Sequence, residues 1–243
     1  MLITDRLEKA KRGFRIVQDL AALSLRREMK AVRQLSDGEE RARHGALEWV
    51  TDTIGRPDPK LGRSGAVCPC TPPALKKGAV TVSVYPESTE ISVDLLRRVT
   101  LREGLAHRRR INRSVTQWEL QTHLVVFPSG RAQDASLLER AWEGCLEALN
   151  EREIMVAVAY PGCPRPALSS PHVLPFDTPV TLFVLRPMTL RDVVFLSNRG
   201  GMRAYQGLFG SRYSRGAVAP GSELATDYAQ KLSQFGLDSG SSS

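Results

Sequence analysis

The hydrophobic positions of this chain change their spacing several times, and each change predicts a new structural element. Over residues 2–53, apolar side chains such as Phe14 and Val32 recur every three to four positions, which is the spacing of one buried helix face. Residues 36–38 interrupt this pattern, so a second helix should begin near Asp37 as its N-cap. We expect the long stripe to be buried against the rest of the chain or against a second copy in a homodimer through these N-terminal helices.

Strand and helix patterns alternate after residue 78. Apolar runs predict strands at residues 79–85, 122–127, 154–160 and 180–185. Helical spacing predicts helices at residues 91–106 and 134–150, a short helix after residue 189, a broken helix at 199–217 and a last helix after Ser222. This order favours an α+β fold with a single mixed or antiparallel sheet of four or five strands and helices on one face. No glycine-rich fingerprint follows a strand, which argues against a Rossmann fold.

Capping signals mark where two of these helices begin. Ser136 and Glu139 have the spacing of a capping box, and Asp134 is an alternative N-cap for the same helix. Thr189 and Asp192 repeat that spacing at the start of the short helix.

The patterns divide the chain into three parts. Residues 1–54 form an N-terminal helical extension, residues 55–220 the α+β domain, and residues 221–243 a C-terminal helix and disordered tail. Residues 55–78 are dense in glycine and proline and predict a long loop. We expect this loop to be ordered, because Cys68 and the residues beside it are seldom left in water.

Composition narrows the class of protein but does not identify it. The 243 residues are 42% hydrophobic and 25% charged, which is typical of a globular protein. No apolar run approaches the about 20 residues that span a bilayer, and the charged N-terminus is not a secretory signal. Four cysteines are too few for a disulfide scaffold, so we expect a cytoplasmic protein. The net charge of +8 permits anionic partners, but the sparse aromatic residues do not indicate nucleic-acid binding.

Three cysteines are candidates for chemistry. Cys68 and Cys70 form a Cys-Pro-Cys motif, and Cys163 lies in a turn after a strand, where a thiol can face a pocket. These three could bind zinc, although the spacing lacks a CxxC pair, and buried structural thiols are the stronger alternative. Cys145 lies on the apolar face of its helix and is expected in the core.

Histidines and arginines supply the other candidates. His172 lies in a loop and is best placed to enter a cleft, whereas His44 and His107 are expected in solvent. The arginines of residues 186–215 are mixed with glycine and tyrosine, and arginine forks bind carboxylate or phosphate groups.

Two blocks of the sequence resemble a known bacterial family of unknown function. They are GRSGAVCPCTPPAL (62–75) and VAYPGCPRPALSSPHVLPFDTPVTLFVLRPMTLRDVVFL (158–196). Members of that family, common beside biosynthetic genes of actinobacteria, show GRxGxVCPF, then FHPxCPxP, then PLRSPVPLLAIRHM. More distantly, the layout resembles the YqcI/YcgG group, which includes the guanitoxin-type haem-dependent arginine hydroxylases. The chain departs from the family pattern at Tyr160 and at Pro187, where the family usually has histidine.

The distant resemblance implies a haem-dependent monooxygenase that oxidises a small amino-acid-derived substrate in the biosynthesis of a specialised metabolite such as an antibiotic. With the two histidines replaced, the candidates to hold haem are Cys68, Tyr160, Cys163, His172 and Met188. Tyr160 and His172 would be catalytic, and a substrate carboxylate would be held by Arg186, Arg199 and Arg203.

Two alternatives from other classes remain open. The first is a cofactor-free enzyme in which Tyr160 and His172 act as an acid–base pair. The second is a non-enzymatic binding protein whose N-terminal helices form the interface. For both enzyme hypotheses we expect Cys68, Tyr160, Cys163, His172 and Arg186 to converge on one cavity, because several of them lie at or just past the carboxyl ends of strands.

Overall fold

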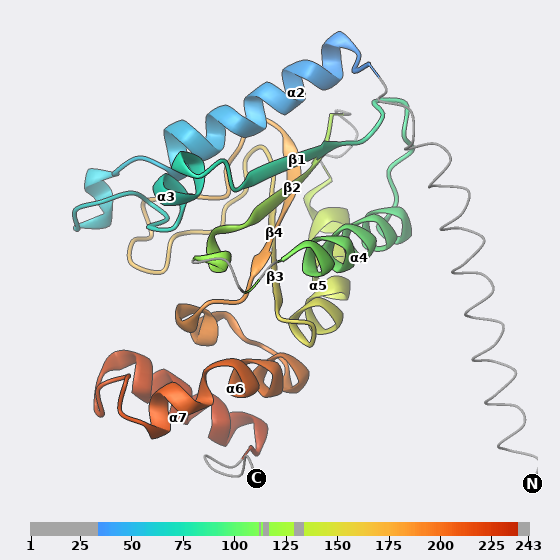
Figure 1. The fold of residues 1–243 in the computed structure, drawn as a ribbon. Helices are drawn as coiled ribbons and strands as arrows, with labels where there is room; N and C mark the ends of the chain where they lie inside the picture. The colour runs from blue at the N-terminus through green and yellow to red at the C-terminus, as the bar shows by residue number, and fades with distance from the viewer. Residues whose placement is uncertain (1–33, 112, 114–116, 129–133, 238–243) are drawn as a thin grey trace, which may run out of the picture. The chain divides into compact units, whose positions relative to one another are not determined.

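Four strands form one open sheet in the order β1-β2-β4-β3. They are β1 (Val80–Val84), β2 (Thr122–Phe127), β3 (Ile154–Ala159) and β4 (Thr181–Pro187). β1 and β2 are parallel, while β4 is antiparallel to both of its neighbours, so the sheet is mixed. The computed structural model describes residues 34–111, 113, 117–128 and 134–237, whose elements are drawn in Figure 1. The predicted α+β class and single mixed sheet are confirmed.

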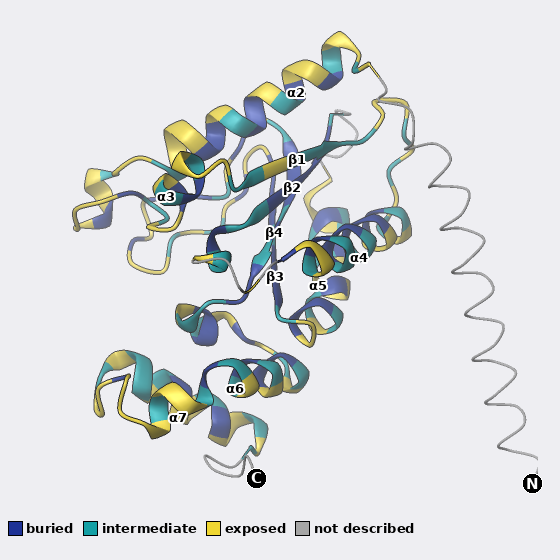
Figure 2. Cartoon of the chain, in the orientation of Figure 1, coloured by how far each residue is buried: buried dark blue, intermediate teal, exposed yellow. Residues whose placement is uncertain are grey.

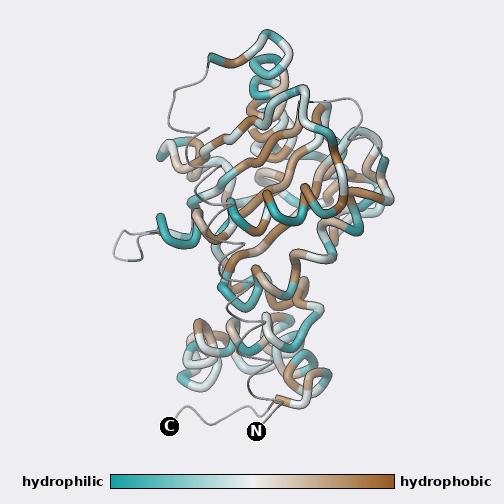
Figure 3. Tube along the Cα trace, turned by 90° about the vertical axis from the view of Figure 1, so that its right-hand side faces the viewer, coloured by the Kyte–Doolittle hydropathy of each residue, from teal (hydrophilic) through white to brown (hydrophobic). Residues whose placement is uncertain are grey.

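Helices cover both faces of this sheet (Figure 1). α4 (Val93–Arg110) and α5 (Ala135–Asn150) cover one face, and α2 (Asp37–Glu48) covers the other. Along β2, Val125 packs in the cluster under α4 and α5, whereas its neighbour Val126 packs in the cluster under α2. The prediction of helices on one face is therefore wrong. The continuous apolar run of β2 agrees with this, because such a run is typical of a strand that is buried on both sides. Figure 2 shows the burial of the central strands, and Figure 3 their apolar composition.

Local hydrogen bonds fix where the helices begin. The Asp134 carboxylate accepts from the backbone N–H groups of Ser136 and Leu137 at 3.0 and 3.3 Å, so Asp134, of the two predicted alternatives, is the N-cap of α5. Ser222 is the N-cap of α7 (Glu223–Phe235), as predicted. Thr189 and Asp192 form the predicted capping box at the start of the 3₁₀ helix η5 (Leu190–Phe195).

The C-terminal helices have an apolar cluster of their own. α6 (Arg199–Ser214) is one continuous helix. The prediction of a broken helix at residues 199–217 is therefore wrong, since the helix is unbroken up to Ser214. Its N-cap is Asn198, whose side chain accepts from the Gly201 N–H at 2.6 Å. The Tyr205 hydroxyl donates to the Leu190 carbonyl at 2.6 Å, which joins α6 to η5.

Only part of the predicted N-terminal extension belongs to the described ranges. α2 begins at Asp37, where the sequence predicts a helix, and continues as a π-helical segment, η1 (Trp49–Ile54). The Trp49 indole N–H donates to the Pro175 carbonyl at 3.2 Å, so η1 is bonded to a loop of the α+β domain. The predicted stripe through Phe14, and with it the homodimer hypothesis, lies in residues 1–33, outside the described residues. In the described ranges, no helix is long and apolar enough to cross a membrane.

The loop at residues 55–78 is ordered by its own backbone hydrogen bonds. It contains the short helices η2 (Pro59–Leu61) and α3 (Thr71–Lys76). The N–H of Cys68 donates to the Ile54 carbonyl at 3.0 Å, and the N–H of Val67 donates to the Arg56 carbonyl at 2.9 Å. These bonds return the chain to the end of η1 and place the Cys-Pro-Cys motif directly before α3, which confirms the expectation of an ordered loop.

Candidate functional site

Arg186 and Asp192 form the base of the candidate site. Arg186 is near the end of β4, on the same face as Val184, which packs in the cluster under α2. Its two terminal nitrogens donate to the two carboxylate oxygens of Asp192 at 2.6 and 2.5 Å, a forked ion pair. Asp192 is buried, whereas the Arg186 side chain remains 28% exposed. Asp192 also accepts from the Thr189 N–H and hydroxyl at 2.6 and 2.9 Å, so the capping box holds the carboxylate in place.

Cys68 lies near this ion pair, and hydrogen bonds within the Cys-Pro-Cys loop act on its thiol. The Cys70 thiol, the Thr71 hydroxyl and the Cys70 backbone N–H all donate to it. The Cys70 thiol is the largest single cause that lowers the pKa of Cys68, to about 5, while burial opposes the change and the positive charge of Arg186 supports it. A thiol with this pKa is a thiolate at neutral pH, and the thiolate is the nucleophilic form of cysteine.

Cys70 has the opposite character because it shares its proton with Cys68. Its hydrogen bond to the Cys68 sulfur, burial and the negative charge of Cys68 raise the pKa of Cys70 far above its ordinary value. The pair therefore loses one proton near pH 5 and keeps the second at neutral pH. Cys70 is nevertheless exposed and Cys68 is partly exposed, so neither residue is sealed from solvent.

The arrangement suits nucleophilic attack by sulfur. In the described part of the chain, the groups that act on Cys68 donate hydrogen bonds or carry positive charge, and none of them is a general base. The thiolate needs no base, because it is already ionised. Arg186 contributes a positive charge beside the sulfur, and Asp192 fixes the guanidinium group in position.

The antiparallel pairing of β3 and β4 separates two predicted site residues from this centre. Arg186 pairs with Met155 near the start of β3, whereas Tyr160 follows the other end of β3. Five residues of strand span about 17 Å. The expectation that Cys68, Tyr160, Cys163, His172 and Arg186 share one cavity is therefore wrong, and only Cys68 and Arg186 come together.

Tyr160 and Cys163 belong to a structural cluster at that other end. The Tyr160 hydroxyl donates to Glu139 at 2.9 Å, and Arg165 donates to both oxygens of Glu139 at 2.7 and 2.8 Å. Burial, the Glu139 hydrogen bond and the Cys163 side chain raise the pKa of Tyr160. Arg165 also stacks over the Trp142 ring, with its guanidinium carbon 4.4 Å from the ring centroid. These contacts hold the loop after β3 against α5.

The remaining predicted residues are also apart from Cys68. Met188 is fully buried in the cluster with α6 and α7. His172 is exposed in the loop after β3. Arg199 and Arg203 are exposed on α6, and Arg199 donates to the Gly236 carbonyl at 3.4 Å. The predicted carboxylate clamp of Arg186 with Arg203 does not form, because Asp192 occupies the fork of Arg186.

The predicted haem ligands do not fit a haem site. Met188 and Cys163 are fully buried in apolar clusters, and the Tyr160 hydroxyl is bonded to Glu139. His172 and Cys68 lie on different loops, and the Cys68 thiol is hydrogen-bonded within its own loop. The zinc alternative also fails, because Cys163 lies at the opposite end of β3 from the Cys-Pro-Cys motif. Among the described residues, no group of three or more His, Cys, Asp or Glu side chains could hold a metal ion.

A buried polar network that the sequence pattern does not predict lies between α4 and the sheet. The His123 Nδ1 is 2.8 Å from the Thr81 hydroxyl, and its Nε2 is 3.5 Å from Glu103. Glu103 accepts from Tyr85 and Arg102 at 3.1 and 2.8 Å.

His107 stacks on His123 within the same network, with the two ring centroids 5.8 Å apart. It is 4% exposed, so the expectation of a solvent-exposed His107 is wrong. His44, by contrast, is exposed, as predicted. The buried face of α4 includes Leu96, Val99 and Thr100, and His107 continues that face one to two turns later. The helical spacing of His107 from these buried residues is the feature of the sequence that could have indicated its burial.

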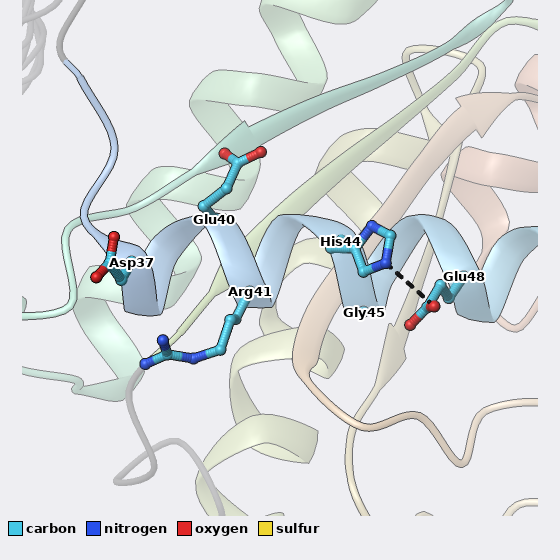
Figure 4. Close-up of a pocket in the computed structure, with 6 residues that line it drawn as sticks. All are labelled: Asp37, Glu40, Arg41, His44, Gly45 and Glu48. Atoms are coloured by element: carbon cyan, nitrogen blue, oxygen red, sulfur yellow. Dashed lines mark ion pairs between the residues drawn. The ribbon is translucent and has the colours of Figure 1, made fainter.

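An open depression lies along α2, away from the Cys-Pro-Cys loop. Six residues of α2 line it: Asp37, Glu40, Arg41, His44, Gly45 and Glu48. Figure 4 shows them along the helix, with the His44 ring paired to Glu48 at 3.1 Å. Their charges are mixed, and no predicted site residue is among them, so this surface carries no argument for chemistry.

Comparison with known proteins gives one match, to a protein-family model. No curated protein and no solved structure matches the chain. Residues 44–219 match the family model DUF6875, described as a domain of unknown function. The matched range contains both parts of the candidate site, the Cys-Pro-Cys loop and the Arg186–Asp192 pair. Since the match covers well over half of the 243 residues, the chain belongs to the DUF6875 family.

Proposed function

We propose that the protein is a cysteine-dependent enzyme in which the Cys68 thiolate attacks a small electrophilic substrate. The observation that carries this proposal is the turn that places Cys70 and Thr71 directly after Cys68, where their hydrogen bonds, with the charge of Arg186, hold the pKa of the Cys68 thiol low. A purely structural cysteine is buried in apolar surroundings, where the pKa of its thiol rises. Cys145 is such a residue, since burial raises its pKa to about 11.

Each residue of the site has a distinct role in this proposal. Cys68 is the nucleophile, and Cys70 and Thr71 stabilise its negative charge by hydrogen bonds. Arg186 provides positive charge at the mouth of the site, where an anionic or developing negative group of the substrate would lie. Asp192 is a positioning residue that acts through Arg186.

The choice of substrate depends on acid–base groups, and none of the described groups that act on Cys68 is a general acid or base. With no general base or acid beside the sulfur, a poor leaving group such as an amine would not be protonated as it departs. An electrophile whose leaving group departs readily, such as a peroxide or a disulfide, needs no such help. This favours small electrophiles with good leaving groups over amides.

This proposal replaces haem-dependent oxidation, which the distant resemblance to the YqcI/YcgG group implies. The cofactor-free alternative is kept, but its catalytic pair moves from Tyr160 and His172 to the Cys-Pro-Cys loop. A haem titration followed at the Soret band distinguishes the two. A band that Tyr160→Phe or His172→Ala shifts would restore the haem hypothesis.

The test is the pH dependence of alkylation by iodoacetamide. At pH 5.5 an ordinary thiol is less than about 0.1% ionised, whereas more than half of a thiol with a pKa of about 5 is ionised. Part of this advantage is lost because nucleophilicity falls with pKa, but an advantage of about tenfold or more should remain. Tryptic digestion releases Cys68 and Cys70 in one peptide, residues 64–76, apart from Cys145 and Cys163.

Matched variants assign the reactive sulfur. In Cys70→Ser the peptide should still be alkylated at pH 5.5, and in Cys68→Ser it should not. Cys145 and Cys163 of the same sample serve as buried internal references. The proposal is wrong if Cys68 reacts no faster than these references, or if its rate rises only near pH 9.

A further inference from the structure

We propose that Cys70 is the resolving partner of Cys68, so that a hydroperoxide converts the Cys-Pro-Cys motif into a disulfide between the two residues. This inference rests on the proposed function, because it needs Cys68 as the attacking thiolate. It goes further by naming hydroperoxides as a substrate class and by giving Cys70 a chemical role.

The backbone brings the two sulfurs within bonding reach. The N–H of Thr71 donates to the Cys68 carbonyl at 3.1 Å, which closes a turn with Pro69 and Cys70 at its two central positions. Adjacent Cα atoms are about 3.8 Å apart, so a bend at Pro69 holds those of Cys68 and Cys70 within the about 4.4–6.8 Å that a disulfide needs. A hydrogen bond between the two thiols is the largest cause that lowers the pKa of Cys68, which agrees with this closeness of the two residues.

The surroundings of Cys68 and Cys70 favour oxidation of this pair rather than of the other two cysteines. Cys70 is exposed and Cys68 partly exposed, whereas the two other cysteines, Cys145 and Cys163, are fully buried. Arg186 lies near both sulfurs of the motif. Its positive charge favours the thiolate and stabilises the negative charge that develops on a departing oxygen.

The first step oxidises Cys68. Its thiolate attacks one oxygen of the hydroperoxide, a sulfur–oxygen bond forms, and the oxygen–oxygen bond breaks. The leaving alkoxide or hydroxide takes a proton from solvent and departs as alcohol or water. Cys68 becomes a sulfenic acid, and the peroxide is reduced by two electrons.

The second step forms the disulfide. Oxidation removes the negative charge of Cys68, which had kept the proton on Cys70, so Cys70 ionises more readily beside Arg186. The Cys70 sulfur attacks the Cys68 sulfur, a disulfide bond forms, and the hydroxyl group leaves as water. Overall, one hydroperoxide and two thiols give one alcohol, one water and one disulfide, and an external thiol restores the reduced pair.

The experiment treats the full chain at pH 6 with hydrogen peroxide, and in parallel with the bulkier cumene hydroperoxide. The mass of the tryptic peptide of residues 64–76 is then measured under non-reducing conditions by mass spectrometry. In the native sequence it should lose two hydrogen atoms and regain them with dithiothreitol. In Cys70→Ser the reaction should stop at the sulfenic acid, which dimedone traps on Cys68. In Cys68→Ser the peptide should remain unchanged.

The outcomes separate this inference from the function on which it rests. If Cys68 is alkylated as a thiolate but peroxide leaves both cysteines reduced, the resolving role is wrong and the nucleophile stands. The same holds if the native protein accumulates the dimedone adduct or higher acids without a disulfide. If Cys68 is not alkylated at low pH, the proposed function itself fails. A product that joins two chains, seen on a non-reducing gel, would also overturn the internal disulfide.

Discussion

The Asp192 carboxylate accepts hydrogen bonds from both terminal nitrogens of Arg186, at 2.6 and 2.5 Å, although the two residues lie in different elements, η5 and β4. The carboxylate is 2% exposed and the guanidinium side chain 28% exposed, so the pair is buried on one side and open on the other. The positive charge of Arg186 also acts on Cys68 of the Cys-Pro-Cys loop, whose pKa it helps to lower. The ion pair thus joins the end of the sheet to the candidate nucleophile.

Replacement of Asp192 by Asn should destabilise the protein by about 2–3 kcal/mol. Breaking a buried ion pair costs about 3–5 kcal/mol, and the partial exposure of Arg186 reduces that cost because water solvates the charge left behind. Urea unfolding measures the change. The double variant Arg186→Met with Asp192→Asn should recover part of the loss, since no charge is left without a partner. Equal losses in the single and double variants would contradict this account.

Cys70→Ala should raise the pKa of Cys68, whereas Cys70→Ser should leave it low. The Cys70 thiol is the largest cause of the lowered Cys68 pKa of about 5, and a serine hydroxyl can replace that donor. The midpoint of the alkylation rate against pH measures the pKa. Arg186→Gln should shift the midpoint less than Cys70→Ala, because the charge of Arg186 makes the smaller contribution. Identical midpoints in the Ala and Ser variants would show that the hydrogen bond is not the cause.

His107 should make the protein sensitive to mild acid. Burial is the main cause that lowers its pKa from 6.5 to about 4, so the unfolded chain binds the proton more tightly than the folded one. The contribution of neutral His107 is therefore complete above about pH 6.5 and is lost as the pH falls towards 4. A shift of this size corresponds to about 3 kcal/mol.

The measurement is the free energy of unfolding from pH 7 to pH 4. His107→Gln, which keeps an N–H for the Gln121 carbonyl, should flatten the decline in this range. His44→Gln, at an exposed position, is the matched control and should follow the native curve. Glu103, whose pKa is lowered to about 2, loses its contribution mainly below pH 4.5, so the curves are compared between pH 7 and pH 4.5. A His107→Gln curve as steep as the native one would reject the assignment.

Gly104→Ala should destabilise the protein by about 1–2 kcal/mol. The new Cβ would lie 2.5 Å from Leu149 Cδ2, and the fully buried Leu149 has no room to move away. Overpacking outweighs the gain of up to about 1 kcal/mol from alanine's helix propensity.

Gly207→Ala is the matched control on another helix, because nothing lies within 4 Å of its added Cβ. It should be neutral or stabilising by up to about 1 kcal/mol. Thermal unfolding compares the two variants. A Gly104→Ala protein as stable as the Gly207→Ala protein would show that α4 and α5 are not closely packed at this point.

Features that depend on neighbours along the chain can be predicted from the amino-acid order alone. Strands such as β2, the start of α7 at Ser222 and the Thr189–Asp192 capping box follow from spacing over a few residues, because local backbone hydrogen bonds and side-chain direction set them. The mixed sheet and the α+β class follow from the order of these elements.

Which residues meet depends instead on how the strands pair and how the loops fold back. Tyr160 and Arg186 both lie at the ends of apolar strands, and the antiparallel register of β3 with β4 places them about 17 Å apart. Cys68 reaches Arg186 because the loop at residues 55–78 folds back to Ile54, and His107 is buried because α4 packs over β2. Such contacts join segments distant in sequence, and local hydrophobic spacing carries no record of strand direction or of the partner across the sheet.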